Sequence, residues 1–130
     1  MAQESPNLSK IARYGISDER GDITFSASVT TYQMTDSERK CKASGAVIAG
    51  TVYLPPVALC KGEFVLVIAT SVATGNVTVK PFEDASNQAE CAIQNGSGAA
   101  TSQALASALA YTLLYSDGEQ WYAVLFDLSI

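Results

Sequence analysis

A polar step that contains Asp117 and Gly118 separates two apolar segments near the C-terminus, residues 109–115 and 121–126. Glycine adopts the positive φ that a tight turn between strands requires, and an aspartate side chain hydrogen-bonds the backbone of such a turn. Both flanking segments are rich in aromatic and large aliphatic side chains, as a packed strand pair requires. The pattern predicts a C-terminal β-hairpin with four structural residues: Asp117, Gly118, Trp121 and Tyr122.

Four further segments have the pattern of strands bounded by turn residues. Residues 23–32 alternate between apolar and polar side chains, which predicts a half-buried strand. Residues 62–70 contain a continuous apolar run, Phe64 to Ala69, which predicts a strand covered on both faces. Residues 43–54 and 77–80 complete the set. Strands at this spacing predict an all-β fold, either a small antiparallel sandwich or a barrel-like domain.

The segment before the hairpin leaves two alternatives open. A short strand is expected at residues 91–93, followed by a glycine-rich turn. In residues 99–110 the alanine content favours a helix, whereas the position directly before a strand pair favours a loop and the entry to a strand. We favour the loop and strand.

The composition argues against several classes of function. The 130 residues are enough for one domain with its own core. Histidine is absent, which removes the commonest general base and the commonest metal ligand, so we expect no enzymatic activity, no metal and no cofactor. The eight Lys and Arg residues are scattered in a chain of net charge −5, which argues against binding to nucleic acid or to an anionic membrane. The three cysteines lack CxxC spacing and are expected to be buried thiols.

The first 22 residues differ in composition from the rest of the chain. They are polar with only isolated apolar side chains, so we divide the chain into an extended N-terminal arm, residues 1–22, and a β-domain, residues 23–130. An arm of this kind lies on a partner protein and becomes ordered on binding. The alternative is a frayed terminus. The expected anchors of the arm on its partner are Leu8, Ile11, Tyr14 and Ile16.

Several short motifs follow one another between residues 51 and 126. They are Leu54-Pro55, a Lys-Gly turn before an apolar strand from Phe64 to Ala69, Val77-Thr78-Val79-Lys80, and Ser116-Asp117-Gly118-Glu119-Gln120-Trp121-Tyr122. In this order they resemble the small β-domains of virion proteins of tailed bacteriophages, in head-decoration proteins and in head or tail fibres. The resemblance implies a homotrimer without enzymatic activity, and in some such proteins an N-terminal arm grips the capsid lattice. The chain has neither long repeats nor a coiled-coil shaft, which favours head decoration over a fibre.

The resemblance therefore predicts a structural protein that decorates or cements a bacteriophage capsid. Its expected partners are the major capsid protein and copies of itself, and its expected location is the capsid surface of the virion, after synthesis in the host cytoplasm. A carbohydrate- or receptor-binding module of a phage fibre or tail is the alternative. A sugar ring would then rest on an aromatic platform, although we expect packing in the core to dominate for these side chains: Tyr111, Tyr115, Trp121 and Tyr122.

Two groups of acidic residues also allow a functional interpretation. Asp117 and Glu119 are close enough in sequence to suggest paired carboxylates for glycoside hydrolysis, but a turn explains both residues without catalysis. Glu83, Asp84 and Glu90 offer oxygen ligands for calcium, but their spacing matches no calcium-binding loop. We interpret the second group as a solvated loop.

Overall fold

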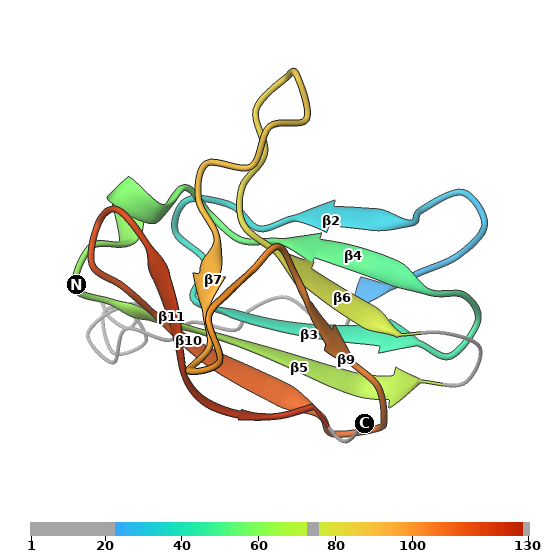
Figure 1. The fold of residues 1–130 in the computed structure, drawn as a ribbon. Helices are drawn as coiled ribbons and strands as arrows, with labels where there is room; N and C mark the ends of the chain where they lie inside the picture. Colours follow the sequence, from blue (N-terminus) through green and yellow to red (C-terminus); the bar gives the residue numbers. More distant parts are fainter. Residues whose placement is uncertain (1–22, 73–75, 129–130) are drawn as a thin grey trace, which may run out of the picture.

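The computed structural model of the chain describes residues 23–72 and 76–128. These residues form eleven strands and one short 3₁₀ helix, η1 (Val57–Cys60) (Figure 1). The strands are β1 (Ile23–Thr24), β2 (Thr31–Gln33), β3 (Lys40–Gly45), β4 (Gly50–Tyr53), β5 (Phe64–Val72), β6 (Val77–Lys80), β7 (Ile93–Gln94), β8 (Ala99–Ala100), β9 (Gln103–Leu105), β10 (Tyr111–Ser116) and β11 (Trp121–Asp127). The predicted arm, residues 1–22, lies outside the described residues.

The strands form two sheets (Figure 1). One sheet has seven strands in the order β1-β3-β5-β10-β11-β7-β8, and the other has four in the order β2-β4-β6-β9. From β1 to β6 the chain crosses to the opposite sheet at every step, and neighbouring strands within each sheet pair in parallel. Each turn of the chain therefore adds one strand to each sheet, which is a β-solenoid-like winding.

The prediction of an all-β fold is confirmed, but its antiparallel part is wrong. Five of the nine strand pairs in the described residues are parallel. A hairpin cannot join parallel neighbours, because the chain must first return to the end of the sheet from which it started. Here the return passes through the opposite sheet. Short strands separated by turn residues have the same sequence pattern in both arrangements, so their spacing alone did not distinguish them.

One apolar core connects the two sheets. Strand alternation buries every second side chain, so that Val65 and Val67 of β5 are fully buried from one sheet and Val77 and Val79 of β6 from the other. Trp121 of β11 is the largest of the fully buried side chains among the described residues. Burial of this apolar area is the main stabilising contribution to the fold.

The predicted strand at residues 23–32 is divided in two. Ser26 and Val29 exchange backbone hydrogen bonds of 2.9 and 3.1 Å and so close a tight turn between β1 and β2. Phe25, directly before the turn, is fully buried, whereas Val29 is exposed. The turn moves the chain from the larger sheet to the smaller one, which an unbroken strand would not allow. Residues 99–110 contain β8 and β9, as the favoured alternative expects.

Candidate functional site

The side of the seven-stranded sheet that faces away from the core is apolar across three adjacent strands, β5, β10 and β11. We call this surface the outer apolar face. Strand alternation places its side chains there, because intervening residues such as Val65, Leu114 and Trp121 are fully buried on the core side. The outer apolar face is defined by eight residues: Phe64, Leu66, Ile68, Tyr111, Leu113, Tyr115, Tyr122 and Leu125.

Strand register arranges the outer apolar face in rows that run across the strands. Directly opposite residues on neighbouring strands have Cβ atoms about 4.5–5.5 Å apart, so large side chains within one row touch. The Phe64 and Tyr115 rings, for example, lie 5.2 Å apart between centroids. From β5 to β11 the rows are Phe64–Tyr115–Tyr122, Leu66–Leu113–Leu125 and Ile68–Tyr111–Asp127.

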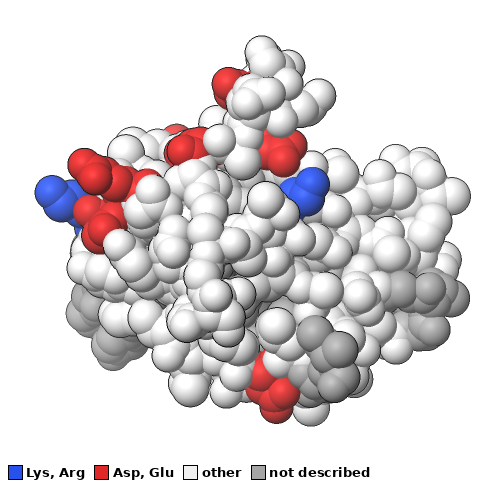
Figure 2. Space-filling model, in the orientation of Figure 1, with Lys and Arg blue, Asp and Glu red and all other residues white. Residues whose placement is uncertain are grey.

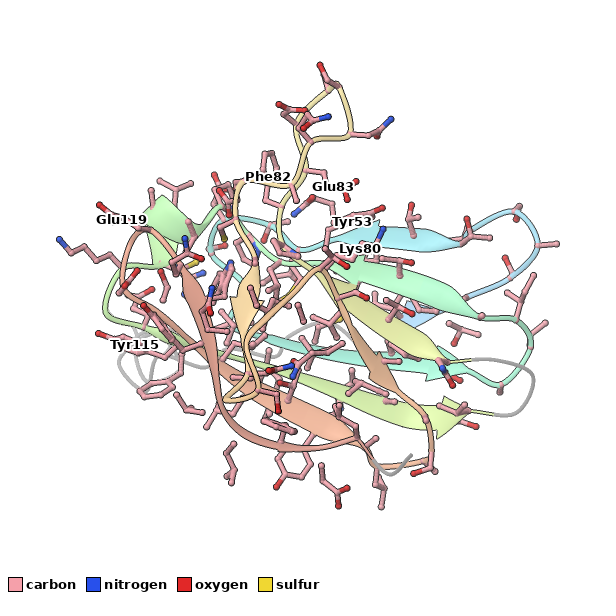
Figure 3. All side chains as sticks on the ribbon, in the orientation of Figure 1. Tyr53, Lys80, Phe82, Glu83, Tyr115 and Glu119 are labelled. Carbon is pink, nitrogen blue, oxygen red and sulfur yellow. The ribbon has the colours of Figure 1, made fainter. Side chains whose placement is uncertain are left out.

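The described residues cover this surface only in part. Leu125 is 57% exposed, Phe64 is 46% exposed and Tyr122 is 37% exposed, and the other five members are half-buried. Figure 3 shows Tyr115 at the left-hand end of the molecule, outside the ribbon of the sheet. Contiguous exposed apolar patches are uncommon on monomeric proteins and mark surfaces that another molecule covers. The outer apolar face is therefore the principal candidate functional site.

Charged side chains of opposite sign lie on two sides of the outer apolar face. Lys40 and Lys42 of β3 pair with Leu66 and Ile68 of β5, so the lysines lie beyond the β5 side. Asp127 ends the third row on the β11 side. The surface thus has an uncharged centre, a basic side and an acidic side.

The strand β11 has an open edge next to this surface. Within the described residues only Trp121 and Tyr122 of β11 pair with β7, and the rest of β11 pairs with β10 alone. A bulge interrupts the β10–β11 pairing, since Leu113 lies opposite Leu125 and Leu114 opposite Ala123. Bulges twist an edge strand and hinder the addition of another strand. Contact through side chains of the face is therefore favoured over extension of the sheet.

The turn between β10 and β11 engages both oxygens of the Asp117 carboxylate. Its Oδ1 accepts hydrogen bonds from the backbone N–H groups of Glu119 and Gln120 at 2.8 and 2.7 Å, and its Oδ2 accepts one from the Tyr122 hydroxyl at 3.1 Å. The bonds from these two amides hold the pKa of Asp117 below its usual value, and the bond to Asp117 raises the pKa of Tyr122. Gly118 has a φ of +94°. This geometry accounts for Asp117 as a residue of the turn.

A second, smaller site lies beside the loop that projects above the two sheets in Figure 1. Figure 3 shows Tyr53, Lys80 and Glu83 near its base, and Lys80 Nζ lies 3.8 Å from Glu83 Oε2. Acidic side chains gather around this base and at the left-hand end of the molecule, each time with a basic side chain close by, and a further acidic group lies at the lower edge (Figure 2). An open hollow of about 320 Å³ is lined by Thr31, Gln33, Tyr53, Glu83, Asp84 and Asn87.

The projecting loop is held by its own hydrogen bonds. Asp84 Oδ1 accepts from the backbone N–H groups of Ser86 and Gln88 at 2.8 and 3.0 Å, and Asn87 has a φ of +62°. Glu90 lies where the loop returns, and its Oε2 accepts a hydrogen bond of 2.7 Å from the backbone N–H of Val57. Burial raises the pKa of Glu90. Asp84 therefore holds the loop and Glu90 the start of η1 through hydrogen bonds to backbone N–H groups. Among the described residues no group of three or more His, Cys, Asp or Glu is arranged to hold a metal ion.

The three cysteines form no disulfide within the described residues. Cys41 and Cys60 are buried, and Cys91 is half-buried. Burial raises the pKa of the thiols of Cys60 and Cys91. Since the thiolate is the reactive form, a raised pKa reduces the reactivity of both side chains at neutral pH.

The structure separates the four aromatic residues of the predicted platform. Tyr111, Tyr115 and Tyr122 belong to the outer apolar face, whereas Trp121 is fully buried and forms no part of an exposed platform. The expected arm residues Leu8, Ile11, Tyr14 and Ile16 lie outside the described residues. Sequence reasoning identified the continuous apolar run at residues 62–70 but did not interpret it, together with the alternating residues of β10, as one exposed surface.

No helix in the described parts of the chain has the length and apolar character needed to span a membrane. Comparisons of the chain with protein-family models, with curated proteins and with solved structures found no match.

Proposed function

We propose that this chain is a non-enzymatic virion structural protein that decorates or cements a bacteriophage capsid as a homo-oligomer. The observation that carries the proposal is the outer apolar face, where eight large side chains on three strands are left partly uncovered. Such a surface is typical of a protein whose function is to bind other proteins. The order of motifs between residues 51 and 126 supplies the link to phage virions.

The proposal assigns a role to each part of the chain. Residues 23–130 are the β-domain, a small sandwich-like body that associates with copies of itself as a homotrimer. Residues 1–22 are the arm, which binds the major capsid protein on the capsid surface. Three arms on one trimer raise the avidity for a repeating lattice, which offsets the entropy lost when each arm becomes ordered.

Replacing the four apolar anchors of the arm with serine is expected to abolish binding to the capsid while the fold and the oligomer remain. The polar remainder of the arm has little apolar surface to bury on a partner. The measurement is co-sedimentation of the full-length variant with undecorated capsids of the virus that encodes the chain. The variant carries serine at Leu8, Ile11, Tyr14 and Ile16.

A matched control replaces polar arm residues, Asn7, Ser9 and Ser17, with alanine and is expected to sediment with capsids as the wild type does. Circular dichroism and light scattering verify the fold and the mass of both variants. Wild-type occupancy of the capsid by the serine variant would show that the arm does not make the attachment.

A carbohydrate- or receptor-binding module is the second candidate function, and the hollow beside the projecting loop favours it. Tyr53 offers an aromatic ring, while Glu83, Asp84 and Asn87 offer hydrogen-bonding groups around the same space. A sugar presents both an apolar ring face and hydroxyl groups, which this combination matches. The buried Trp121 has no part in such a site.

Tyr53→Ala is expected to lower affinity for a glycan at least about 5-fold if the hollow binds sugar, since an aromatic contact at the centre of a site is worth more than about 1 kcal/mol. A glycan array identifies the ligand, and titration calorimetry measures the affinity. Val47→Ala, at an exposed apolar residue that does not line the hollow, is the control and is expected to bind normally. Undiminished binding by Tyr53→Ala would contradict this site.

A further inference from the structure

We propose that Asn95 is a site of self-modification, at which the folded chain converts the side-chain amide into a carboxylate by way of a succinimide. Asn95 and Gly96 begin the turn that joins β7 to β8. They form the one Asn-Gly step in the sequence. The proposal goes beyond the proposed function and does not depend on it, because it concerns a reaction of the chain alone.

The turn between β7 and β8 exposes the peptide bond at which the reaction takes place. Gln94 of β7 lies opposite Ala99 of β8, and the Asn95 N–H donates a hydrogen bond of 3.1 Å to the Gly98 carbonyl. Gly96 is exposed and has a φ of +88°, which glycine adopts without strain. A Cβ atom built at Gly96 would meet no atom within 4 Å. Solvent therefore reaches this peptide bond, and no side chain hinders the Gly96 nitrogen.

The carboxamide of Asn95 is held in a position that favours attack on its carbon. Its Oδ1 accepts a hydrogen bond of 3.0 Å from the backbone N–H of Ser97. This bond closes a ring that contains both Asn95 Cγ and the Gly96 nitrogen, as in a turn formed by an Asn side chain. It also places a donor on the oxygen that becomes negative when Cγ is attacked, as an oxyanion hole does.

The nucleophile and the leaving group are not engaged elsewhere in the described residues. There the Gly96 N–H donates no hydrogen bond, and Asn95 Nδ2 donates none. The Gly96 nitrogen can therefore lose its proton and Nδ2 can depart without breaking a contact of the fold.

The reaction needs water as its only other component. The Gly96 nitrogen loses a proton to solvent and forms a bond to Asn95 Cγ. The bond from Cγ to Nδ2 then breaks, and Nδ2 takes up a proton and leaves as ammonia. Water adds to either carbonyl of the succinimide and opens the ring, which gives aspartate or isoaspartate at position 95. The added carboxylate changes the net charge of the chain from −5 to −6.

The other two asparagines in the described residues lack this combination of features. Asn87 precedes Gln88, whose backbone N–H already donates a hydrogen bond of 3.0 Å to Asp84 Oδ1. Asn76 precedes Val77, whose branched side chain is fully buried and crowds the nitrogen that would attack. We therefore expect the modification to be selective for Asn95.

The two products have different consequences for the sheet. Aspartate keeps the length of the backbone, and its carboxylate accepts the N–H of Ser97 as the amide does. Isoaspartate adds a carbon atom to the backbone of a short loop, which disturbs the register of Ile93 with Ala100. Ile93 also pairs with Trp121 of β11. The isoaspartate form is therefore expected to exchange the backbone amides of β7 and β8 faster with deuterium than the unmodified chain.

Incubation of the folded full-length protein at mildly alkaline pH tests the proposal. A species with one more negative charge is expected to accumulate on anion exchange, faster as the pH rises, because the deprotonated nitrogen attacks. Peptide mass spectrometry is expected to locate the change at position 95. Asn95→Gln is expected to lose this species, because the longer side chain must close a larger ring. Asn87→Gln is the matched control and is expected to react as the wild type does.

A synthetic peptide of residues 91–100 separates the effect of the fold from that of the sequence. The folded chain is expected to react at Asn95 at least as fast as the peptide. Ser97→Pro removes the N–H donor and is expected to slow the reaction about 5-fold, which is the worth of one exposed hydrogen bond. Ser97→Ala keeps that N–H and is the control, and circular dichroism verifies the fold of both variants.

Two results would overturn the proposal. A folded chain that stays unmodified at Asn95 while the peptide reacts would remove the site. Equal rates in Ser97→Pro and Ser97→Ala would remove the part assigned to the Ser97 N–H. Neither result affects the binding of the chain to capsids, which is measured separately.

Discussion

Replacement of Trp121 by alanine is expected to lower the free energy of unfolding by about 3–5 kcal/mol, the range measured when a buried aromatic side chain is truncated. Trp121 is fully buried and is the first residue of β11. There it pairs with Ser116 of β10 on one side and with Ile93 of β7 on the other. Its removal leaves a cavity at the position where β7 joins the sheet. The expected loss is a large part of the about 5–15 kcal/mol that stabilises a whole domain.

Urea denaturation at one fixed protein concentration measures this effect, because association contributes to the apparent stability. Val47→Ala is the control, since substitution of an exposed residue usually changes stability by less than about 0.5 kcal/mol. An unchanged midpoint for Trp121→Ala would contradict the burial of the indole and would return Trp121 to the candidates for a sugar-binding platform.

The strands were predictable where the signal is local. Asp117 and Gly118 in a polar step between two apolar segments determine the β10–β11 hairpin, and their turn depends only on neighbouring residues. Residues 77–80 match β6 in the same way, because Pro81 follows directly and ends the strand. Signals of this kind describe where a strand starts and ends.

The solenoid-like winding was not predictable from such signals. The parallel pairing of β3 with β5 joins residues such as Cys41 and Val67, which are far apart in sequence. The turn at Ser26–Val29 separates two sheets, although residues 23–32 alternate as one continuous strand does. Partner and register of a strand depend on contacts with distant segments, and a single sequence contains no direct record of these contacts.

The candidate site was predictable only in part, for a related reason. Alternation places Tyr111, Leu113 and Tyr115 on one side of β10 and Thr112 and Leu114 on the other. Both sides contain large apolar residues, so the pattern does not say which side forms the core. In the structure the side with Thr112 and Leu114 forms the core. There the Thr112 hydroxyl donates a hydrogen bond to the side-chain oxygen of Gln103, which is also buried. That bond lets a polar residue lie in the core while the tyrosines lie outside.

Gly50→Ala is the second substitution with a large expected effect, although it adds only one methyl group. Gly50 is the first residue of β4 and is buried beneath the ring of Phe25. A Cβ atom at Gly50 would lie 2.2 Å from Phe25 Cγ and within 2.4 Å of two further ring atoms. Overpacking of a core usually costs about 1–3 kcal/mol, and we expect a loss at or above the upper end of that range because the ring lies fully buried with little room to move.

A double-mutant cycle shows whether the contact with Phe25 causes this loss. Phe25→Ala alone is expected to cost about 3–5 kcal/mol, because it empties a fully buried position. In that background the ring is gone, so Gly50→Ala meets no obstacle and is expected to add little. The two substitutions are therefore expected to be strongly non-additive, as is usual for residues in direct contact. Additive losses in urea denaturation would instead mean that Gly50 is required for its backbone conformation, independently of the packing of Phe25 against β4.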